Sequence, residues 1–239
     1  CDFFNKFNIN YIFSLLFKSS DIKIIYKDLK KINTVKFINV LAGYVDSSEI
    51  KKYEKYSKKK STDFTYRVFS AKARNGYLGY QKIMIGNLFK DKLIDSKYSF
   101  DISTDIKKTI YGSKWIKFMA SSKYTLGIEG GSSLYDPVYR LRDKCLEYEK
   151  KYPMSSFQQI EKNCFKGLDK KISGAVITPR MFEAAMAKTC MLLVEGKYNG
   201  ILIKNIHYIP IKNDLSNIQD ILKKLNEENR KKITERCYK

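Results

Sequence analysis

The chain has 239 residues, of which 44% are hydrophobic and 14% aromatic, so it can bury a sizeable core and disorder throughout is excluded. Its formal net charge of +21, taken alone, points to nucleic acid, an anionic membrane surface or phosphorylated substrates, although the excess is mostly scattered lysine. The five cysteines show no CxxC spacing and indicate neither a zinc site nor a disulfide framework, which fits reduced thiols in the cytoplasm.

The first 60 residues give a weak pattern. The apolar segment from Phe3 to Phe17 is too short and too polar to span a bilayer, which takes about 20 apolar residues. Its aromatic character indicates packing against something that precedes it, so we expect a fragment. Ile22 to Tyr26 and Val35 to Leu41 are predicted as short strands. The basic cluster from Lys51 to Lys60 is predicted as a flexible or helical connector, with a basic strip that stacks on nucleic acid as the alternative.

After residue 60 the pattern becomes regular, with β-formers and helical periodicities in alternation. Strand, helix, strand, helix, strand with short connections is typical of a parallel sheet wound with helices. We therefore predict an α/β, Rossmann-like parallel sheet with helices on both faces over residues 61–239, and a remnant of another domain over residues 1–60. The expected strands are Phe64 to Ala71, Tyr98 to Ile102 and Tyr124 to Glu129, and the expected helices are Gly79 to Leu93 and Ile106 to Ser121, with Trp115 on a core face.

A helical insertion is expected near residues 136–177. It contains helices at Val138 to Tyr152 and Phe157 to Lys166, the second with a capping box at Ser156 and Gln159. The sheet is then expected to resume with a buried strand, a short strand and an amphipathic helix, at Cys190 to Glu195, Tyr208 to Ile211 and from about Ser216.

The helix that starts at Thr178 carries the clearest functional pattern. Thr178 fits the N-cap and Pro179 the first helical position, so the first-turn amides are free to meet an anion. At 3.6 residues per turn, Arg180 and Glu183 share a face with Ala184 and Ala187, and we expect the small alanines to let a ligand approach the backbone. One interpretation gives Arg180 the phosphates and Glu183 a sugar hydroxyl. The other is a surface ion pair worth about 0.2 to 0.5 kcal/mol.

Ligands of open α/β sheets bind at the carboxyl ends of strands, near a topological switch point. Three segments are expected at such ends, namely Arg67 to Arg74, Glu129 to Ser133 and Glu195 to Tyr198. Gly130 and Gly131 allow close backbone approach, and the serine that follows can donate to phosphate. A simple turn stays the alternative for each segment.

Five stretches of the sequence together resemble a known family. They read ITPRMFEAA at 177–185, LLVEGKYNGIL at 192–202, HYIPIKNDLSN at 207–217, IYGSKW at 110–115 and TLGIEGG at 125–131. The combination resembles bacterial glycosyltransferases of the two-domain GT-B type, of the group-1-like and spore-maturation kinds, over roughly residues 64–225.

The resemblance implies that this region is the carboxyl-terminal, donor-binding domain, which holds a nucleotide sugar as donor substrate. It implies no cofactor and usually no metal, since helix amides and basic side chains neutralise the leaving diphosphate. Arg180 would stabilise the departing phosphates and Glu183 would bind a ribose hydroxyl. The donor pocket would be lined by Arg67, Glu129, Gly130, Gly131, Ser132, Thr178, Gly196 and Tyr198.

The chain departs from the family pattern in two places. Ala175 stands where many retaining members carry a second Glu, so the stereochemical outcome stays open. Residues 1–60 are too few for the family's amino-terminal domain, which supplies most acceptor contacts. His207, the only histidine, has no identifiable carboxylate partner and is expected to be structural.

The sequence thus predicts a cytoplasmic glycosyltransferase of cell-surface glycan or polysaccharide assembly, acting on a glycan or lipid-linked acceptor. Peripheral contact with the inner face of the membrane stays open, because basic surface attracts anionic lipid. Two alternatives are a catalytically incomplete nucleotide-binding module and a basic nucleic-acid binder, although no specific nucleic acid is expected as a partner.

Overall fold

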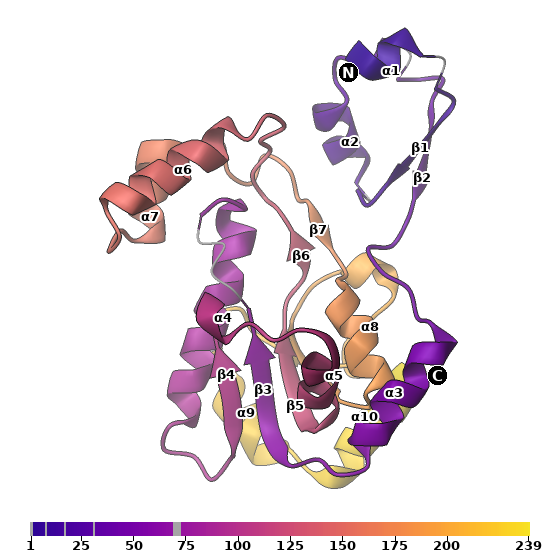
Figure 1. Cartoon of the computed structure of the whole chain (residues 1–239), viewed down its shortest axis with the longest axis vertical. Helices are drawn as coiled ribbons and strands as arrows, with labels where there is room; N and C mark the ends of the chain where they lie inside the picture. The colour runs from indigo at the N-terminus through magenta and orange to yellow at the C-terminus, as the bar shows by residue number, and fades with distance from the viewer. Residues whose placement is uncertain (1, 8, 17, 31, 69–72) are drawn as a thin grey trace. The chain divides into compact units, whose positions relative to one another are not determined.

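A computed structural model describes residues 2–7, 9–16, 18–30, 32–68 and 73–239 (Figure 1). The chain divides into two compact units. Unit 1 consists of Cys1–Ala42, Ala71–Tyr80 and Gly130–Val176, and unit 2 consists of Gly43–Ser70, Gln81–Glu129 and Ile177–Lys239.

Unit 2 contains a five-stranded sheet in which every neighbouring pair of strands is parallel. The strands are β3 (Thr62–Arg67), β4 (Phe100–Ser103), β5 (Ser122–Gly127), β8 (Cys190–Val194) and β9 (Ile209–Ile211). Their order is β4-β3-β5-β8-β9, and Thr65 of β3 lies opposite Asp101 on one side and Thr125 on the other. The parallel α/β sheet predicted from the sequence is thereby confirmed.

Helices cover both faces of this sheet, and the central strand β8 is apolar on both faces. Cys190, Leu192 and Val194 of β8 join one apolar core, whereas Met191 and Leu193 join the other. The first core includes side chains of α4 (Gly76–Leu93), α9 (Ile218–Lys224) and α10 (Glu227–Tyr238), and the second those of α3 (Ser47–Ser57), α5 (Gly112–Ala120) and α8 (Pro179–Met186). All five residues of β8 are buried, as expected for a central parallel strand.

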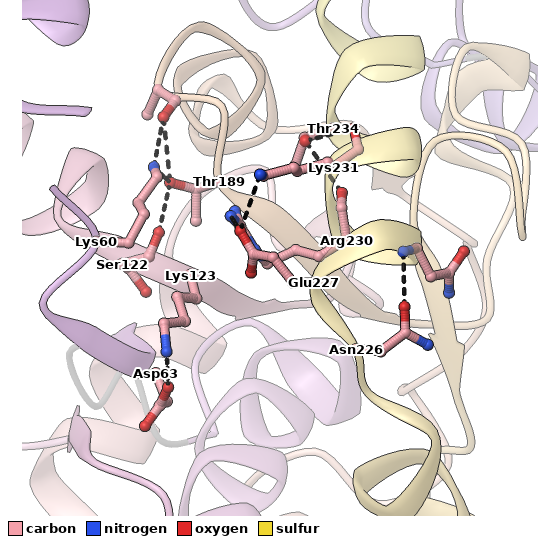
Figure 2. Close-up of polar contacts among 12 residues, drawn as sticks. Lys60, Asp63, Ser122, Lys123, Thr189, Asn226, Glu227, Arg230, Lys231 and Thr234 are labelled. Carbon is pink, nitrogen blue, oxygen red and sulfur yellow. Dashed lines mark hydrogen bonds and ion pairs between the residues drawn. The ribbon is translucent and has the colours of Figure 1, made fainter. Parts of the chain in front are cut away.

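Lys60 lies beside Thr189 in unit 2 (Figure 2), and its ammonium joins two helix ends. The ammonium of Lys60 donates to the carbonyls of Ala120 at 2.8 Å and Ala187 at 2.7 Å, and to the hydroxyl of Thr189 at 3.1 Å. Ala120 is the last residue of α5 and Ala187 is the C-cap of α8. Carbonyls at helix carboxyl ends lack intrahelical partners and carry partial negative charge, so a cation satisfies both.

In its described residues, unit 1 contains two small sheets and the helices that flank them in the sequence. β1 (Tyr11–Ser14) and β2 (Lys36–Asn39) pair in parallel, next to α1 (Asp2–Lys6) and α2 (Ser19–Ile25) in the sequence. β6 (Gly130–Gly131) and β7 (Ala175–Val176) pair antiparallel and enclose α6 (Arg140–Lys151) and α7 (Phe157–Cys164) in the sequence. The two helices predicted within residues 136–177 are therefore confirmed, as is the capping box of Ser156 and Gln159.

The amino end of α4 also lies in unit 1 and is capped by side chains from two segments distant in the sequence. The Asp169 carboxylate accepts from the Tyr77 amide at 2.8 Å, and the Ser133 hydroxyl accepts from the Leu78 amide at 3.1 Å. Gly76 has φ +64, and a Cβ there would lie 2.2 Å from the Asp169 carboxylate. The first-turn donors of α4 thus already have an anionic partner.

Several predicted boundaries differ from the structure. Residues 22–26, predicted as a strand, are mostly in helix α2, where buried Asp21 accepts from the amides of Ser173 and Gly174, a contact that local pattern cannot show. The helix expected from Ile106 to Ser121 is a 3-10 turn, η1 (Ile106–Lys108), followed by α5, and Gly112 has φ +59 at the break. The connector over residues 51–60 is largely helical, in α3, and the terminal helix is divided into α9 and α10. β3 ends at Arg67, and residues 69–72 of its predicted extension lie outside the described residues.

Candidate functional site

Unit 2 contains a cavity of about 470 Å³ at the carboxyl ends of β3 and β5. If the five strands are numbered from 1 to 5 in chain order, their order across the sheet is 2-1-3-4-5. The chain therefore reverses its winding direction between β3 and β5. Ligands of open α/β sheets bind at this kind of switch point. The lining includes Tyr66, Arg67 and Val68 of β3 and its end, Thr125 to Ile128, Lys82, Trp115, and Thr178 to Met181 with Glu183.

Tyr66 lies at the centre of the site and is fully buried. Its hydroxyl donates to the carbonyl of Lys82 in α4 at 3.0 Å. A Cβ at Gly86 would lie 2.8 Å from the Tyr66 ring, so glycine is required for α4 to approach the strand this closely. Burial raises the pKa of Tyr66 to about 12, while Arg180 acts in the opposite direction. Tyr66 is therefore a neutral hydrogen-bond donor at physiological pH.

Arg180 and Glu183 both line the cavity, from the first turns of α8. The guanidinium carbon of Arg180 lies 5.6 Å from the centroid of the Tyr66 ring and 5.4 Å from that of Trp115. Glu183 accepts a hydrogen bond from the Trp115 indole nitrogen at 2.9 Å. Among the described residues, Arg180 and Glu183 form no ion pair with each other. The alternative prediction of a surface ion pair between them is therefore wrong.

The start of α8 agrees with the sequence prediction, but the burial of its two faces does not. Thr178 is the N-cap and Pro179 the first helical residue, and the Thr178 amide and hydroxyl both contact the Met181 sulfur, at 3.4 and 3.6 Å. Ala184 and Ala187, expected to face a ligand, are fully buried. The expectation was wrong because α3, α5 and β8 all pack against this short helix, whereas Arg180 and Glu183 stay partly exposed and line the cavity.

Cations outnumber anions around the cavity. Its charged side chains are Arg67, Lys82, Arg180, Asp105 and Glu183. Burial and, to a smaller extent, the positive charge of Arg180 together lower the pKa of Lys82 to about 8. Two cations held together in a partly buried cavity favour a ligand that carries negative charge.

Arg67 lines the cavity but its donors already have partners. Its guanidinium donates to the carbonyls of Lys108, Tyr66 and Asp101, and pairs with the Asp101 carboxylate at 2.6 Å. The group also lies 4.7 Å from the Phe118 ring centroid. Arg67 thus ties β3 to β4 and to the loop before α5, and forms part of the cavity wall.

Glu129, Gly196 and Tyr198 are brought together, but they do not line this cavity. The Glu129 carboxylate accepts from the Tyr198 amide at 2.8 Å, and a Cβ at Gly196 would lie 2.6 Å from that carboxylate. Tyr198 is fully buried and its hydroxyl donates to the Val194 carbonyl. These three residues therefore fix the turn after β8.

Gly130, Gly131 and Ser132 belong to unit 1 and also do not line the cavity. Gly130 and Gly131 pair with Val176 and Ala175, and the Ser132 hydroxyl donates to the Leu134 carbonyl at 2.8 Å. Gly131 has φ +94, and a Cβ there would lie 1.8 Å from the Gly174 carbonyl oxygen. The paired glycines thus serve the close β6 to β7 pairing.

The remaining polar candidates have local roles. The His207 ring accepts from the Ile203 amide at 3.0 Å, in agreement with the expected structural role. No cluster of three or more His, Cys, Asp or Glu side chains suited to a metal ion occurs among the described residues. None of the helices in the described part of the chain has the length and apolar character that crossing a membrane requires.

Two comparisons of the sequence with known proteins, a scan against protein-family models and a search of the curated proteins, identify no relative of this chain. What the structure establishes is an α/β unit with a five-stranded parallel sheet flanked by helices, as in Rossmann-like folds.

Proposed function

We propose that unit 2 binds the nucleotide part of a nucleotide sugar, and that the protein is a glycosyltransferase that moves the sugar to a glycan, polysaccharide or lipid-linked acceptor. The observation that carries the proposal is the position of Arg180 and Glu183. They come from one helix start and line one cavity with Trp115, at the switch point of a parallel sheet.

The chemistry of the cavity suits a nucleoside diphosphate. Arg180 has a fork of donors that matches phosphate oxygens, and cation–π contacts with the Tyr66 and Trp115 rings hold its guanidinium in the cavity. Glu183 keeps acceptor capacity beyond its bond to Trp115, since a carboxylate accepts about four hydrogen bonds. It can therefore receive ribose hydroxyls.

Sugar transfer follows from the same arrangement. When the bond between the anomeric carbon and the diphosphate breaks, negative charge grows on the leaving phosphate oxygen. A fixed cation beside that oxygen stabilises the transition state more than the ground state. In this proposal Arg180 supplies that stabilisation, and Glu183 positions the nucleotide so that the leaving oxygen meets it.

The test uses the single tryptophan of the chain. Trp115 lines the cavity, so a bound nucleotide changes its environment. Titration with UDP and GDP is expected to change the tryptophan emission saturably for one of them, and to raise the melting temperature. At 100 times Kd, ligand binding adds about 2.7 kcal/mol to the free energy of unfolding.

The decisive variant is the double substitution Arg180→Ala and Glu183→Ala, which should abolish both responses while circular dichroism shows an intact fold. The matched control is Lys188→Ala with Glu235→Ala, which removes an exposed ion pair of 3.2 Å elsewhere in unit 2. Equal nucleotide affinity in the parent and in the Arg180 and Glu183 variant would refute the proposed site.

Transfer itself is tested by incubating the chain with the sugar form of the nucleotide that binds. Release of the nucleoside diphosphate, by transfer or by hydrolysis, is the expected result. Binding without any release would favour the second reading of the sequence, a nucleotide-binding module without catalysis.

A further inference from the structure

We propose that Lys82 is a second phosphate-binding residue, which acts with Arg180 to hold the two phosphates of a diphosphate. The assignment rests on the proposed nucleotide site and extends it to a residue on a different helix. The sequence pattern gave Lys82 no role, because it lies within an ordinary helical periodicity.

Tyr66 fixes both cations relative to the cavity. Its hydroxyl holds the backbone of Lys82, and its ring lies beneath the guanidinium of Arg180. Lys82 and Gly86 are four residues apart and so share a face of α4, and Gly86 is the point where that face meets the Tyr66 ring. The Lys82 side chain consequently enters the cavity from the α4 side, while Arg180 enters it from α8.

In the described part of the chain neither Lys82 nor Arg180 is in an ion pair, although the carboxylates of Glu183 and Asp105 line the same cavity. The carboxylate of Glu183 is bonded to the Trp115 indole, and Asp105 is the N-cap acceptor of η1, bonded to the Lys107 amide at 2.9 Å. Lys82 and Arg180 are therefore both available to a ligand with two or more negative charges, which a neutral nucleoside does not supply.

Protonation of Lys82 should therefore be linked to binding. The other titratable groups that line the cavity are Tyr66, Arg67, Asp105, Tyr111, Arg180 and Glu183. With the pKa of Lys82 lowered to about 8 by burial and by Arg180, an arriving diphosphate raises that pKa again. Binding above pH 8 then takes up a proton, and affinity falls as the pH rises further.

The experiment is titration calorimetry of the full chain with UDP, GDP, uridine, guanosine and inorganic pyrophosphate, at pH 7 and pH 9. The variants are Lys82→Met, Lys82→Arg and the control Lys90→Met, which removes an exposed lysine from the same helix. We expect Lys82→Met to weaken nucleoside diphosphate binding about tenfold or more at pH 7, with Lys82→Arg restoring most of it.

Two readouts separate phosphate binding from a structural role of Lys82. The advantage of the diphosphate over its nucleoside should shrink in Lys82→Met, whereas damaged folding would weaken both ligands alike. Proton uptake at pH 9, measured in buffers of different ionisation enthalpy, should occur in the parent chain and in Lys90→Met, and be absent in Lys82→Met and Lys82→Arg.

The outcomes distinguish this assignment from the proposed function. Parent binding that Lys82→Met leaves unchanged would overturn the role of Lys82 alone. Pyrophosphate binding that depends on Lys82, without nucleotide binding, would support Lys82 and overturn the nucleotide-sugar function. Absence of binding by the parent to every probe would overturn both.

Discussion

At the scale of residues, two partly buried lysines of unit 2, Lys60 and Lys82, have different surroundings. The Lys60 ammonium donates to three acceptors, two of which are carbonyls at helix ends. Lys82 instead lies beside another cation. Two effects compete at Lys60, because its acceptors favour the charged form, whereas burial and the charge of Arg230 lower its pKa to about 7.

We predict that the stability contributed by Lys60 rises with pH. Its pKa is about 7 in the folded state and 10.5 in the unfolded state, so the unfolded chain binds more protons between these values. The free energy of unfolding of the parent, minus that of Lys60→Met, should rise by about 2 to 3 kcal/mol from pH 7.5 to pH 9.5. Urea unfolding at both pH values measures it.

Lys59→Met is the control for this prediction, since Lys59 is an exposed neighbour. The difference between the parent and Lys59→Met should not depend on pH in this range. A pH-independent difference for Lys60→Met as well would mean that the three acceptors keep Lys60 charged throughout.

Local pattern predicted the residues of the site that occur in one motif. Thr178, Arg180 and Glu183 are close in sequence, so a helix start places all of them at one strand end. Lys82 and Tyr66 join them through contacts between distant segments, which no periodicity reveals. Trp115 was assigned to a core face, yet it also lines the cavity, because α5 begins only at Gly112 and its first turn reaches the strand ends.

At the scale of elements, the close contact between α4 and β3 positions Lys82 and Tyr66 in the site. We predict that Gly86→Ala lowers the free energy of unfolding by about 1 to 3 kcal/mol, because its Cβ would lie 2.8 Å from Tyr66 and 3.0 Å from Thr104. It should also weaken nucleotide binding, since Tyr66 holds the helix that carries Lys82.

Thermal and urea unfolding measure the first effect, and tryptophan fluorescence measures the second. Lys90→Ala tests the same helix at an exposed position and should be close to neutral. Unchanged stability of Gly86→Ala would show that α4 can move away from β3 without loss.

A second prediction at this scale concerns α7 in unit 1. The Ser156 hydroxyl accepts from the Gln159 amide at 3.2 Å, and the Gln159 side chain accepts from the Ser156 amide at 2.8 Å. Removing the hydroxyl in Ser156→Ala should cost about 0.5 to 2 kcal/mol. Faster hydrogen exchange of the α7 amides is the expected sign, and Ser155→Ala, next to the cap, should leave exchange unchanged.

Most of the unit 2 elements could be predicted from the sequence, since buried strands and amphipathic helices have distinct periods. Prediction failed where pairing is nonlocal. β1 lies inside an apolar segment that shows no alternation, and it becomes a strand only by pairing with β2 more than 20 residues later. The isoleucines of α2 favour a strand. In the structure this segment is helical, and its buried Asp21 accepts hydrogen bonds from the amides of Ser173 and Gly174.

At the scale of the whole molecule, the charge of +21 makes adsorption to any polyanion a concern in each binding experiment. Contacts of exposed lysines with duplex DNA release counterions and weaken steeply with salt. Charges inside a partly buried cavity are screened less. We predict that raising salt from about 50 to about 200 mM weakens DNA binding at least about tenfold more than nucleotide binding.

Fluorescence anisotropy of a labelled duplex and tryptophan titration with the nucleotide, in the same buffers, give the two salt slopes. Strong DNA binding that persists at the higher salt would instead favour the nucleic-acid reading of the sequence. Equal slopes for the two ligands would indicate that the nucleotide, too, binds on the exposed surface.

The order of synthesis on the ribosome determines when the sheet of unit 2 can be completed. Residues 130–176 are synthesised between β5 and α8, although they belong to unit 1. Before α8 is synthesised, the sheet of unit 2 can contain only β4, β3 and β5, and the edge of β5 that pairs with β8 is unpaired. Arg180, Glu183 and that missing strand emerge together afterwards, so a nascent chain acquires its binding cavity and closes its exposed strand edge in the same step.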